Sequence, residues 1–325
     1  MAPPPRIFDL TRAELAALAG RALDAAVRAS EGRAMVSEVF AAAPGLVDGV
    51  HNAELMAAHG ADVIVLNLVE GAWSDSGTWS FPSLGTQPDL SALAATIGRP
   101  VGVNLEPDPG GDRIPPRRRA TAANAAALRD TGAALLVLTA NPGTGASYAD
   151  LVDVTTELRD AVGADGAIWV GKMHHAGRPE KVTPDAVLPL VDAGASGVLV
   201  PIPGTVPGVT RELATAVTEA VHERGALVLG TIGTSQEGAS EAIARTLALT
   251  AKEVGFDAHH VGDAGYHGVG DPLLLYAYSL AVRGRRHTWR RMALGARTPR
   301  PARPHPSGDQ SSVGRAVDRD PPPAL

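Results

Sequence analysis

The stretch "RRRATAANAAALRDTGAALLVLTAN" (117–141) decides the fold, because it contains one complete helix followed by one complete strand. Alanine and leucine recur at helical spacing in its first part, and Gly132 stands where a glycine is expected after a helix. The run "ALLVLTAN" (134–141) is then apolar at successive positions, which is typical of a strand buried on both faces. The stretch therefore predicts a helix packed against a parallel sheet.

The same unit recurs along the chain. Successive apolar runs start 28 to 38 residues apart, with helical stretches between them. The other seven runs lie at 34–40, 62–68, 100–107, 167–173, 196–203, 226–233 and 257–263. Eight such units predict a closed (β/α)8 barrel, or TIM barrel. The rival is an open doubly wound sheet, which requires a G-x-G-x-x-G loop after its first strand, and "SEVFAAAPGLVDG" does not contain one.

The two ends of the chain differ in character. Residues 8–30 predict an extra helix before the barrel, where Thr11 and Glu14 fit a capping box. Residues 271–284 predict the last barrel helix. From 297 to 325 the chain is rich in Pro, Arg, Ser and Asp, with almost no apolar periodicity, which predicts a disordered tail. We therefore expect one barrel domain over 1–296.

Composition excludes several classes of protein. The 325 residues carry a net charge of −6, which argues against a general nucleic-acid surface. There is no cysteine, so disulfides and thiolate chemistry are excluded. The start lacks the apolar segment of a signal peptide, and no apolar run reaches the length of about 18 residues that a membrane helix needs. We expect a soluble cytoplasmic protein without a membrane partner; a homo-oligomer stays open.

Polar side chains gather where the predicted strands end. Barrel active sites are built at the carboxyl ends of the strands, and the opposite ends here carry little beyond Gly, Ala and Asp. The polar residues are Glu38, Asn67, Asn104, Glu106, Thr139, Asn141, Lys172, His174 and His175. Each asparagine alone could be a turn former. Together, Asn67, Asn104 and Asn141 on neighbouring strands predict a polar lining that binds the substrate.

Lys172 is one of only three lysines, and it ends a strand within "VGKMHHAG" (170–177). A lysine at a barrel mouth can form a Schiff base, abstract a proton or stabilise an enolate, and burial would lower its pKa for the first two roles. His174 or His175 could relay protons. The alternative is a buried ion pair with Glu38 or Glu106 and no chemistry. We expect Lys172 to be a catalytic residue with Glu38, Glu106 and His175 beside it.

Two glycine-rich loops predict a grip for an anion. The loop "GTIGTSQEGAS" would place its backbone N–H groups just before the next helix, where a phosphate or carboxylate is favoured. "GDAGYHG" could complete the grip after the last strand. The predicted anion-binding residues are Gly233, Thr234, Ser235, Gly262 and Gly265. An ordinary helix cap is the alternative. Asp263, between these glycines, would hold Lys172, a histidine or a substrate hydroxyl.

Three functions fit this pattern. The leading hypothesis is a lyase, aldolase or isomerase that acts on a small phosphorylated or carboxylated carbonyl metabolite, with Lys172 as electrophile or base. The second is a metal-assisted hydrolase or lyase, and the third a non-catalytic sensor of such an anionic metabolite. His259 and His260 point to opposite faces of their strand, so at most one lines the barrel. The candidate ligands of a divalent metal are Glu38, Glu106, His175 and His260, and nothing indicates a nucleotide cofactor.

Several motifs also carry a resemblance. The segments "LVDGVHNAELMAAHGADVIVLNL", "NPGTG", "GKMHHAG", "PIPGTVPG", "GTIGTSQEG", "HHVGDAGYHG" and "RGRRHTWRRMA" resemble those of a bacterial barrel family over residues 7–294. Members carry the labels phosphoenolpyruvate phosphonomutase-like or haloacid dehalogenase-like hydrolase. The chain lacks the acidic metal cluster and Glu-Asp-Lys loop of the first group. It carries Glu38 where the second needs a nucleophilic Asp. The resemblance implies the barrel and leaves the reaction open.

Overall fold

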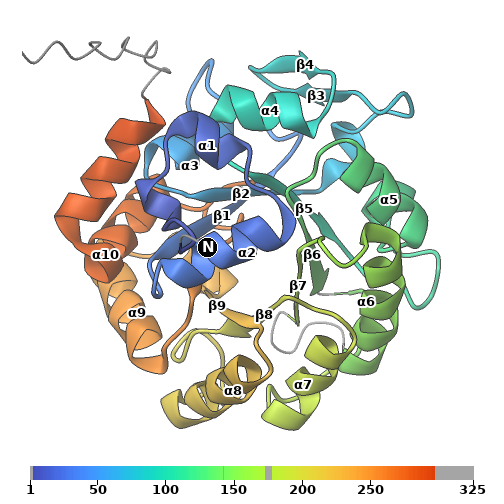
Figure 1. The fold of residues 1–325 in the computed structure, drawn as a ribbon, viewed down its shortest axis with the longest axis vertical. Helices are drawn as coiled ribbons and strands as arrows, with labels where there is room; N and C mark the ends of the chain where they lie inside the picture. The colour runs from blue at the N-terminus through green and yellow to red at the C-terminus, as the bar shows by residue number, and fades with distance from the viewer. Residues whose placement is uncertain (1–2, 142, 173–177, 297–325) are drawn as a thin grey trace, which may run out of the picture.

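Eight parallel strands close into a barrel in the computed structural model, with helices around the outside (Figure 1). The structure describes residues 3–141, 143–172 and 178–296, so the tail predicted at 297–325 lies outside the described residues. The barrel strands are β1 (Ala34–Phe40), β2 (Val63–Asn67), β5 (Val101–Leu105), β6 (Leu135–Ala140), β7 (Ile168–Lys172), β8 (Gly197–Pro201), β9 (Leu227–Thr231) and β10 (Ala258–Val261). The predicted (β/α)8 barrel and its eight strands are confirmed.

A helix follows each strand. They are α3 (Asn52–Ala58), α4 (Leu90–Ile97), α5 (Ala122–Asp130), α6 (Tyr148–Val162), α7 (Pro184–Asp192), α8 (Arg211–Glu223), α9 (Glu241–Val254) and α10 (Pro272–Gly295). The helix predicted to end at 284 continues as α10 to Gly295. It is kinked at Gly284, because this residue takes the non-helical angles φ 71° and ψ 170°. No helix in the described part of the chain is long and apolar enough to cross a membrane.

Strand side chains alternate between two apolar cores. Inward residues such as Val36, Val137 and Trp169 fill the barrel, while their neighbours, such as Ile168, pack against the surrounding helices. This alternation follows from the two-residue period of a strand. It also decides which polar residue at a strand end can reach the barrel mouth, by which we mean the opening at the carboxyl ends of the strands.

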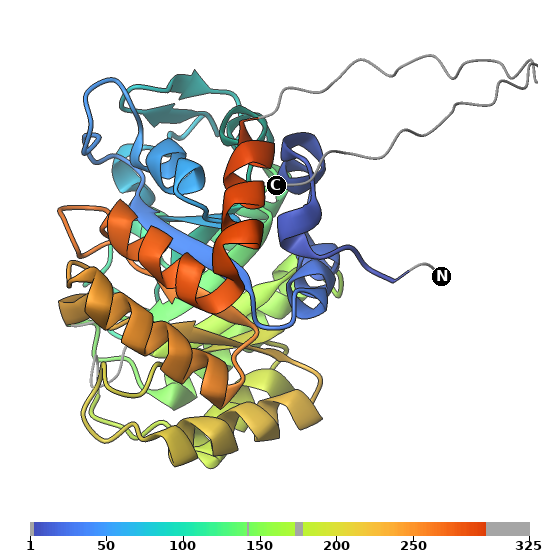
Figure 2. The same ribbon diagram turned by 90° about the vertical axis from the view of Figure 1, so that its left-hand side faces the viewer.

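The N-terminal segment closes the opposite end of the barrel. Figures 1 and 2 show α1 (Arg12–Ala16) and α2 (Gly20–Ala29) lying across that end, and Phe8 belongs to the same apolar cluster as the barrel interior. The capping box of Thr11 and Glu14 is confirmed. Two short helices replace the single predicted one, because Gly20 turns the chain with φ 54° and its N–H donates to Ala134 O at 2.8 Å.

Buried arginines hold this closed end together. Arg283 pairs with Asp62 at 2.6 Å, and both side chains are fully buried. Arg99 donates to the carbonyls of Ala57 and Ala61, at 2.7 and 2.5 Å. Burial lowers the pKa of Arg99 to about 9. The guanidinium groups thus add hydrogen bonds to carbonyls at the carboxyl end of α3 and in the connection that follows it.

Short 3₁₀ helices and one hairpin lie in the N-terminal segment and in the loops after the strands. The 3₁₀ helices are η1 (Ile7–Asp9), η2 (Val69–Gly71), η3 (Pro116–Arg118) and η4 (Thr234–Gln236), and the loop after β2 carries the hairpin β3 (Trp79–Phe81) and β4 (Gly85–Gln87). Trp73 stacks on Trp79 in this loop, with ring centroids 5.5 Å apart. The loop is therefore packed as a small apolar layer of its own.

Candidate active site

Five polar side chains on β1, β2, β5, β6 and β10 project into the barrel where these strands end. They share the inward parity of the apolar interior and are Glu38 on β1, Asn67 on β2, Asn104 on β5, Thr139 on β6 and His260 on β10. Four of them are less than one-tenth exposed, and Asn67 is half-buried. Because β1 pairs with both β2 and β10, Glu38 lies between the strands of Asn67 and His260.

Glu38 and His260 form the centre of this group. His260 Nε2 lies 3.1 Å from Glu38 Oε2, without hydrogen-bond alignment, so the contact is ionic. Glu38 Oε1 and His260 Nδ1 are buried without any hydrogen-bond partner among the described residues. Burial alone would lower the pKa of His260, but Glu38 and the charges of Glu237 and Asp263 raise it overall. The imidazole is therefore held in its protonated form more strongly than a free histidine.

Two further carboxyl groups face this pair from the loops. Burial, together with the charge of Glu38, raises the pKa of Asp263 to about 7. Burial likewise raises the pKa of Glu237, to about 7, against a hydrogen bond from the Ala264 N–H at 2.6 Å. Four titratable groups thus share charge and protons at the mouth of the barrel, which is the arrangement that acid–base catalysis at neutral pH requires.

A chain of side-chain hydrogen bonds orients Asp263. Thr139 Oγ1 donates to Asn104 Oδ1 at 2.9 Å, and Asn104 Nδ2 donates to Asn67 Oδ1 at 3.3 Å. Asn67 Nδ2 then donates to Asp263 Oδ2 at 2.8 Å. The predicted polar lining is thus present for Asn67 and Asn104, which are brought together. Asn141 is not part of this chain; its described hydrogen bonds involve only its main-chain carbonyl, which accepts from Thr144.

The glycine-rich loops bind a carboxylate of the protein itself. A Cβ at Gly262 would lie 2.2 Å from Glu237 Oε1, and one at Gly265 would lie 2.4 Å from Glu237 O. The N–H groups of Gly262 and Ala264 therefore face Glu237. Gly233 caps η4, and Thr234 and Ser235 are its first two residues, whereas α9 begins only at Glu241. The predicted placement of these three residues directly before the long helix is wrong, because a 3₁₀ turn intervenes.

Lys172 lies on the other side of its strand. Trp169 and Gly171 face the barrel interior, so Lys172 projects towards the helices. Its Nζ donates to Ala146 O at 3.0 Å and contacts Glu180 Oε2 at 2.5 Å. The expected ion pair of Lys172 with Glu38 or Glu106 is therefore wrong, and the structure does not bring Lys172 together with these carboxylates.

Glu106 points inward but has its own cation. Arg118 Nε donates to Glu106 Oε1 at 2.9 Å, and Arg118 also pairs with Glu70 at 3.2 Å. Burial would lower the pKa of Arg118, but Glu106 and Glu70 raise it. One guanidinium thus serves two carboxylates and ties the loop after β2 to the loop after β5.

The histidine predictions separate into three cases. His260 lines the barrel, as the alternation requires, and His259 packs outside it, with Nδ1 2.9 Å from Tyr278 Oη and a pKa that burial lowers to about 4. His174 and His175 lie outside the described residues. Of the proposed metal ligands, Glu38 and His260 meet, whereas Glu106 is bound to Arg118. No group of three or more metal-ligating side chains forms within the described ranges.

Sequence reasoning missed three of the residues that shape these contacts. They are Arg118, Glu180 and Glu237. Glu237 stands inside the loop "GTIGTSQEGAS", and an acid between glycines in a loop predicted to bind an anion is a signal in itself, because such loops also bind carboxylates. Arg118 belongs to the run "RRR", which gives no sign of which arginine turns inward. Glu180 lies a few residues beyond the segment 173–177, which the structure does not describe. The sequence around it shows no periodicity or motif.

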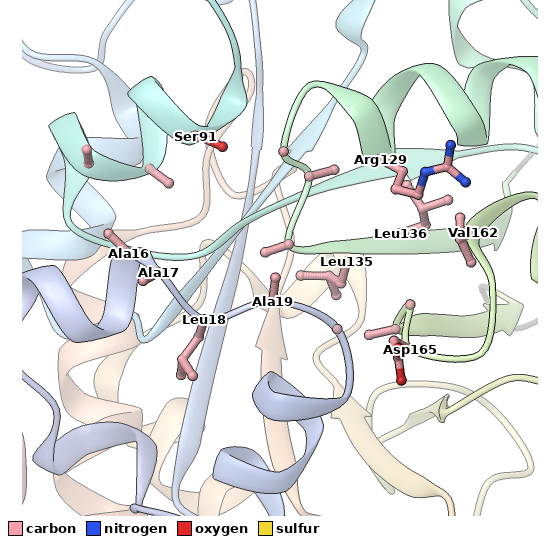
Figure 3. A pocket seen from close by; sticks show the side chains of 18 of the residues that line it. Ala16, Ala17, Leu18, Ala19, Ser91, Arg129, Leu135, Leu136, Val162 and Asp165 are labelled. Atoms are coloured by element: carbon pink, nitrogen blue, oxygen red, sulfur yellow. The ribbon is translucent and has the colours of Figure 1, made fainter.

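A cavity lies at the opposite end of the barrel. It measures about 860 Å³ and lies between the α1–α2 connection and the start of β6 (Figure 3). Ala16, Ala17, Leu18, Ala19 and Leu135 line it, with Arg129 and Asp165 at its edge. It holds apolar side chains and main chain but no cluster of titratable groups. We therefore place the chemistry at the barrel mouth, where the titratable groups converge.

Comparison with known proteins identifies the family. The chain belongs to the family described as Domain of unknown function (DUF7916), whose model matches residues 8–298. This match shows membership of a TIM-barrel family, and it confirms neither the phosphonomutase-like nor the haloacid dehalogenase-like label. No curated protein matches the chain significantly.

Three solved structures illustrate how distant the structural relatives are. A provisionally assigned lyase/mutase from Burkholderia cenocepacia J2315 is 21% identical, with a TM-score of 0.48 over 74% of this chain and 80% of that one. An archaeal fructose 1,6-bisphosphate aldolase is 16% identical, with a TM-score of 0.49 over 80% and 97%. Thiamine phosphate pyrophosphorylase from Pyrococcus furiosus is 11% identical, with a TM-score of 0.45 over 78% and 96%. Likenesses at this level carry no argument about activity.

Proposed function

We propose that this DUF7916 member is a proton-transfer enzyme of the lyase, aldolase or isomerase type, acting on a small carbonyl metabolite at the barrel mouth. The observation that supports this proposal is the buried Glu38–His260 pair, in which Glu38 Oε1 and His260 Nδ1 have no partner among the described residues. Unpartnered polar atoms in a buried site cost free energy that the fold has no reason to bear unless a ligand satisfies them.

Each group has a definite role in this proposal. Glu38 Oε1 accepts the proton from the carbon beside the substrate carbonyl. His260, whose pKa is raised, donates a proton to the carbonyl oxygen. The substrate then passes through a neutral enol, so no full negative charge develops on it. Asp263, positioned by Asn67, exchanges protons with His260 and the substrate. A pKa of about 7 suits that task at neutral pH.

Lys172 has no chemical step in this proposal. Its ammonium group faces the helices and is bound to Ala146 and Glu180. A Schiff base there would require the side chain to leave these partners and cross to the other face of β7. The phosphate or carboxylate of the substrate that the sequence predicts stays a prediction.

The test is exchange of substrate protons with solvent deuterium. Wild-type protein is incubated in D2O with hydroxyacetone, dihydroxyacetone, dihydroxyacetone phosphate, pyruvate and aminoacetone, and loss of the α-proton signal is followed by NMR. We expect catalysed exchange with at least one compound, reduced about 100-fold in Glu38→Gln and in His260→Gln. Glu223→Gln, an equal charge change on the exposed end of α8, is the control. Exchange that survives in both site variants would refute the proposed roles.

A further inference from the structure

The barrel mouth carries more negative than positive groups. Three carboxyl groups, Glu38, Glu237 and Asp263, lie near the single imidazole of His260, with Glu38 Oε2 3.1 Å from its Nε2. Each of the two loop carboxyls is influenced by the charge of Glu38, and all three act on His260. Among the described residues, these contacts contain no lysine or arginine. An anionic substrate group placed among them would meet repulsion on several sides.

The neighbouring cations are already in use. Arg118 is bound by Glu106 and Glu70. Lys172 lies behind the strand and is bound by Glu180. A guanidinium with two carboxylates has little net positive charge to offer a third anion. The charge excess at the mouth is therefore not balanced by the side chains next to it in the described part of the chain.

The backbone donors of the nearest glycine-rich loop are in use as well. Ala264 N–H donates to Glu237 Oε2 at 2.6 Å, and the N–H of Gly262 also acts on the Glu237 carboxylate. A substrate phosphate at this place would have to displace Glu237. The sequence predicts that this loop binds an external anion, but the carboxylate of Glu237 occupies that place. The site therefore presents the oxygens of Glu237 to a ligand, and these oxygens accept hydrogen bonds.

In the described part of the chain, the mouth presents an unused acceptor on Glu38 beside the unpartnered ring nitrogens of His260. Glu38 Oε1 is buried and has no partner among the described residues, and the whole residue is only 8% exposed. Asn67 Oδ1 already accepts hydrogen bonds from Leu68 N–H and Asn104 Nδ2, and Asn104 Oδ1 accepts one from Thr139. A ligand that donates hydrogen bonds and carries positive charge would satisfy Glu38 and reduce the repulsion between the carboxyl groups.

We infer that the substrate bound at the barrel mouth carries an ammonium group, which lies among Glu38, Asp263 and Glu237, so that the substrate class is a small amino-carbonyl compound. This inference rests on the proposed function, because it names the substrate class of the same site. It differs from the anionic metabolite that the sequence predicts. The carbonyl of such a substrate faces His260, and its ammonium group donates to Asp263 and Glu237, so that Glu38 Oε1 can still accept the proton from the neighbouring carbon.

The test compares three probes of nearly equal size: ethanolamine, ethylene glycol and glycolate. All three share a hydroxymethyl group, and the second group is positively charged in ethanolamine, neutral in ethylene glycol and negatively charged in glycolate. Binding is followed through the side-chain NH2 signals of Asn67 and Asn104 in NMR spectra, because these amides hydrogen bond into the site. We expect ethanolamine to bind about tenfold more tightly than glycolate, with ethylene glycol between them.

The variants decide whether the preference comes from this cluster. Glu38→Gln should reduce the ethanolamine preference at least threefold. Glu223→Gln removes the same charge at the exposed end of α8 and should leave the preference unchanged. Tighter binding of glycolate, equal binding of all three probes, or no binding of any of them at high millimolar concentration overturns the inference. The exchange assay is independent of these results: exchange of pyruvate or dihydroxyacetone phosphate alone would preserve the proposed function and refute the ammonium substrate.

Discussion

Replacing each partner of the Lys172–Glu180 pair should destabilise the fold by unequal amounts. The Lys172 side chain is fully buried, whereas the Glu180 side chain is 33% exposed. After Lys172→Met, water can solvate the remaining carboxylate, which still accepts the Tyr148 N–H at 3.0 Å. After Glu180→Ala, the ammonium group stays buried, and Ala146 O is its remaining partner among the described residues. The stranded buried charge is the costlier of the two.

The magnitudes follow from the exposure of the group that is left behind. Leaving a charge in a buried place costs about 3–5 kcal/mol, so we expect Glu180→Ala to lose about 3 kcal/mol of unfolding free energy. Loss of a partner for a solvated carboxylate costs about 1 kcal/mol, the value expected for Lys172→Met. Methionine keeps the stem of the lysine, so packing against Tyr148 changes little.

Urea denaturation of wild type, both single variants and the double variant measures these values. The double variant should be close to Lys172→Met in stability, because removing the ammonium group removes the stranded charge. Proton exchange of the substrate should be unchanged in Lys172→Met. A larger loss for Lys172→Met than for Glu180→Ala, or a folded Lys172→Met protein without activity, would refute the structural role and return Lys172 to the catalytic residues.

Three further predictions follow from other parts of the molecule. Asp263 has a raised pKa of about 7, so the folded state keeps a proton that the unfolded state loses from about pH 4 upward, and stability falls as the pH rises from 4 to 7. Asp263→Asn should therefore be more stable than wild type at pH 8, by about 1–3 kcal/mol, with the difference vanishing at pH 4 in thermal denaturation. Asp62→Ala strands the buried Arg283 and should cost about 3–5 kcal/mol in urea denaturation; a loss below 1 kcal/mol would contradict the buried pair. Removal of residues 298–325 should leave the melting temperature unchanged, because that segment has little apolar surface to contribute; a large decrease would contradict this expectation.

The sequence predicted the strands well and the direction of Lys172 poorly. Apolar runs at regular spacing are enough to place eight strands, because each run must be buried on both faces. Because the strand before Lys172 is buried on both faces, its run "AIWV" shows no alternation of polar and apolar residues. The side of the strand on which the Lys172 side chain lies can therefore not be predicted from the sequence. The sequence predicts that at most one of His259 and His260 lines the barrel, since adjacent strand residues face opposite ways.

The partners of the site could not be predicted in the same way. Arg118, Glu180 and Glu237 lie in loops, and no periodicity describes the path of a loop. The carboxylate of Glu237 takes the N–H donors of its neighbouring loop because it is tethered nearby, whereas a free anion would have to be bound from solution. A sequence pattern for anion binding cannot distinguish these two occupants.

The most direct test of the account is the titration of His260 by NMR, followed through the ring signals that disappear in His260→Gln. The account places this imidazole beside Glu38 and two further carboxyl groups, so its pKa should lie above the ordinary value of about 6.5. Glu38→Gln removes the nearest negative charge and should lower that pKa, because burial then acts with less opposition. A pKa of His260 below 6.5 in the wild type, or one that Glu38→Gln leaves unchanged, would contradict the charged pair on which the proposed chemistry depends.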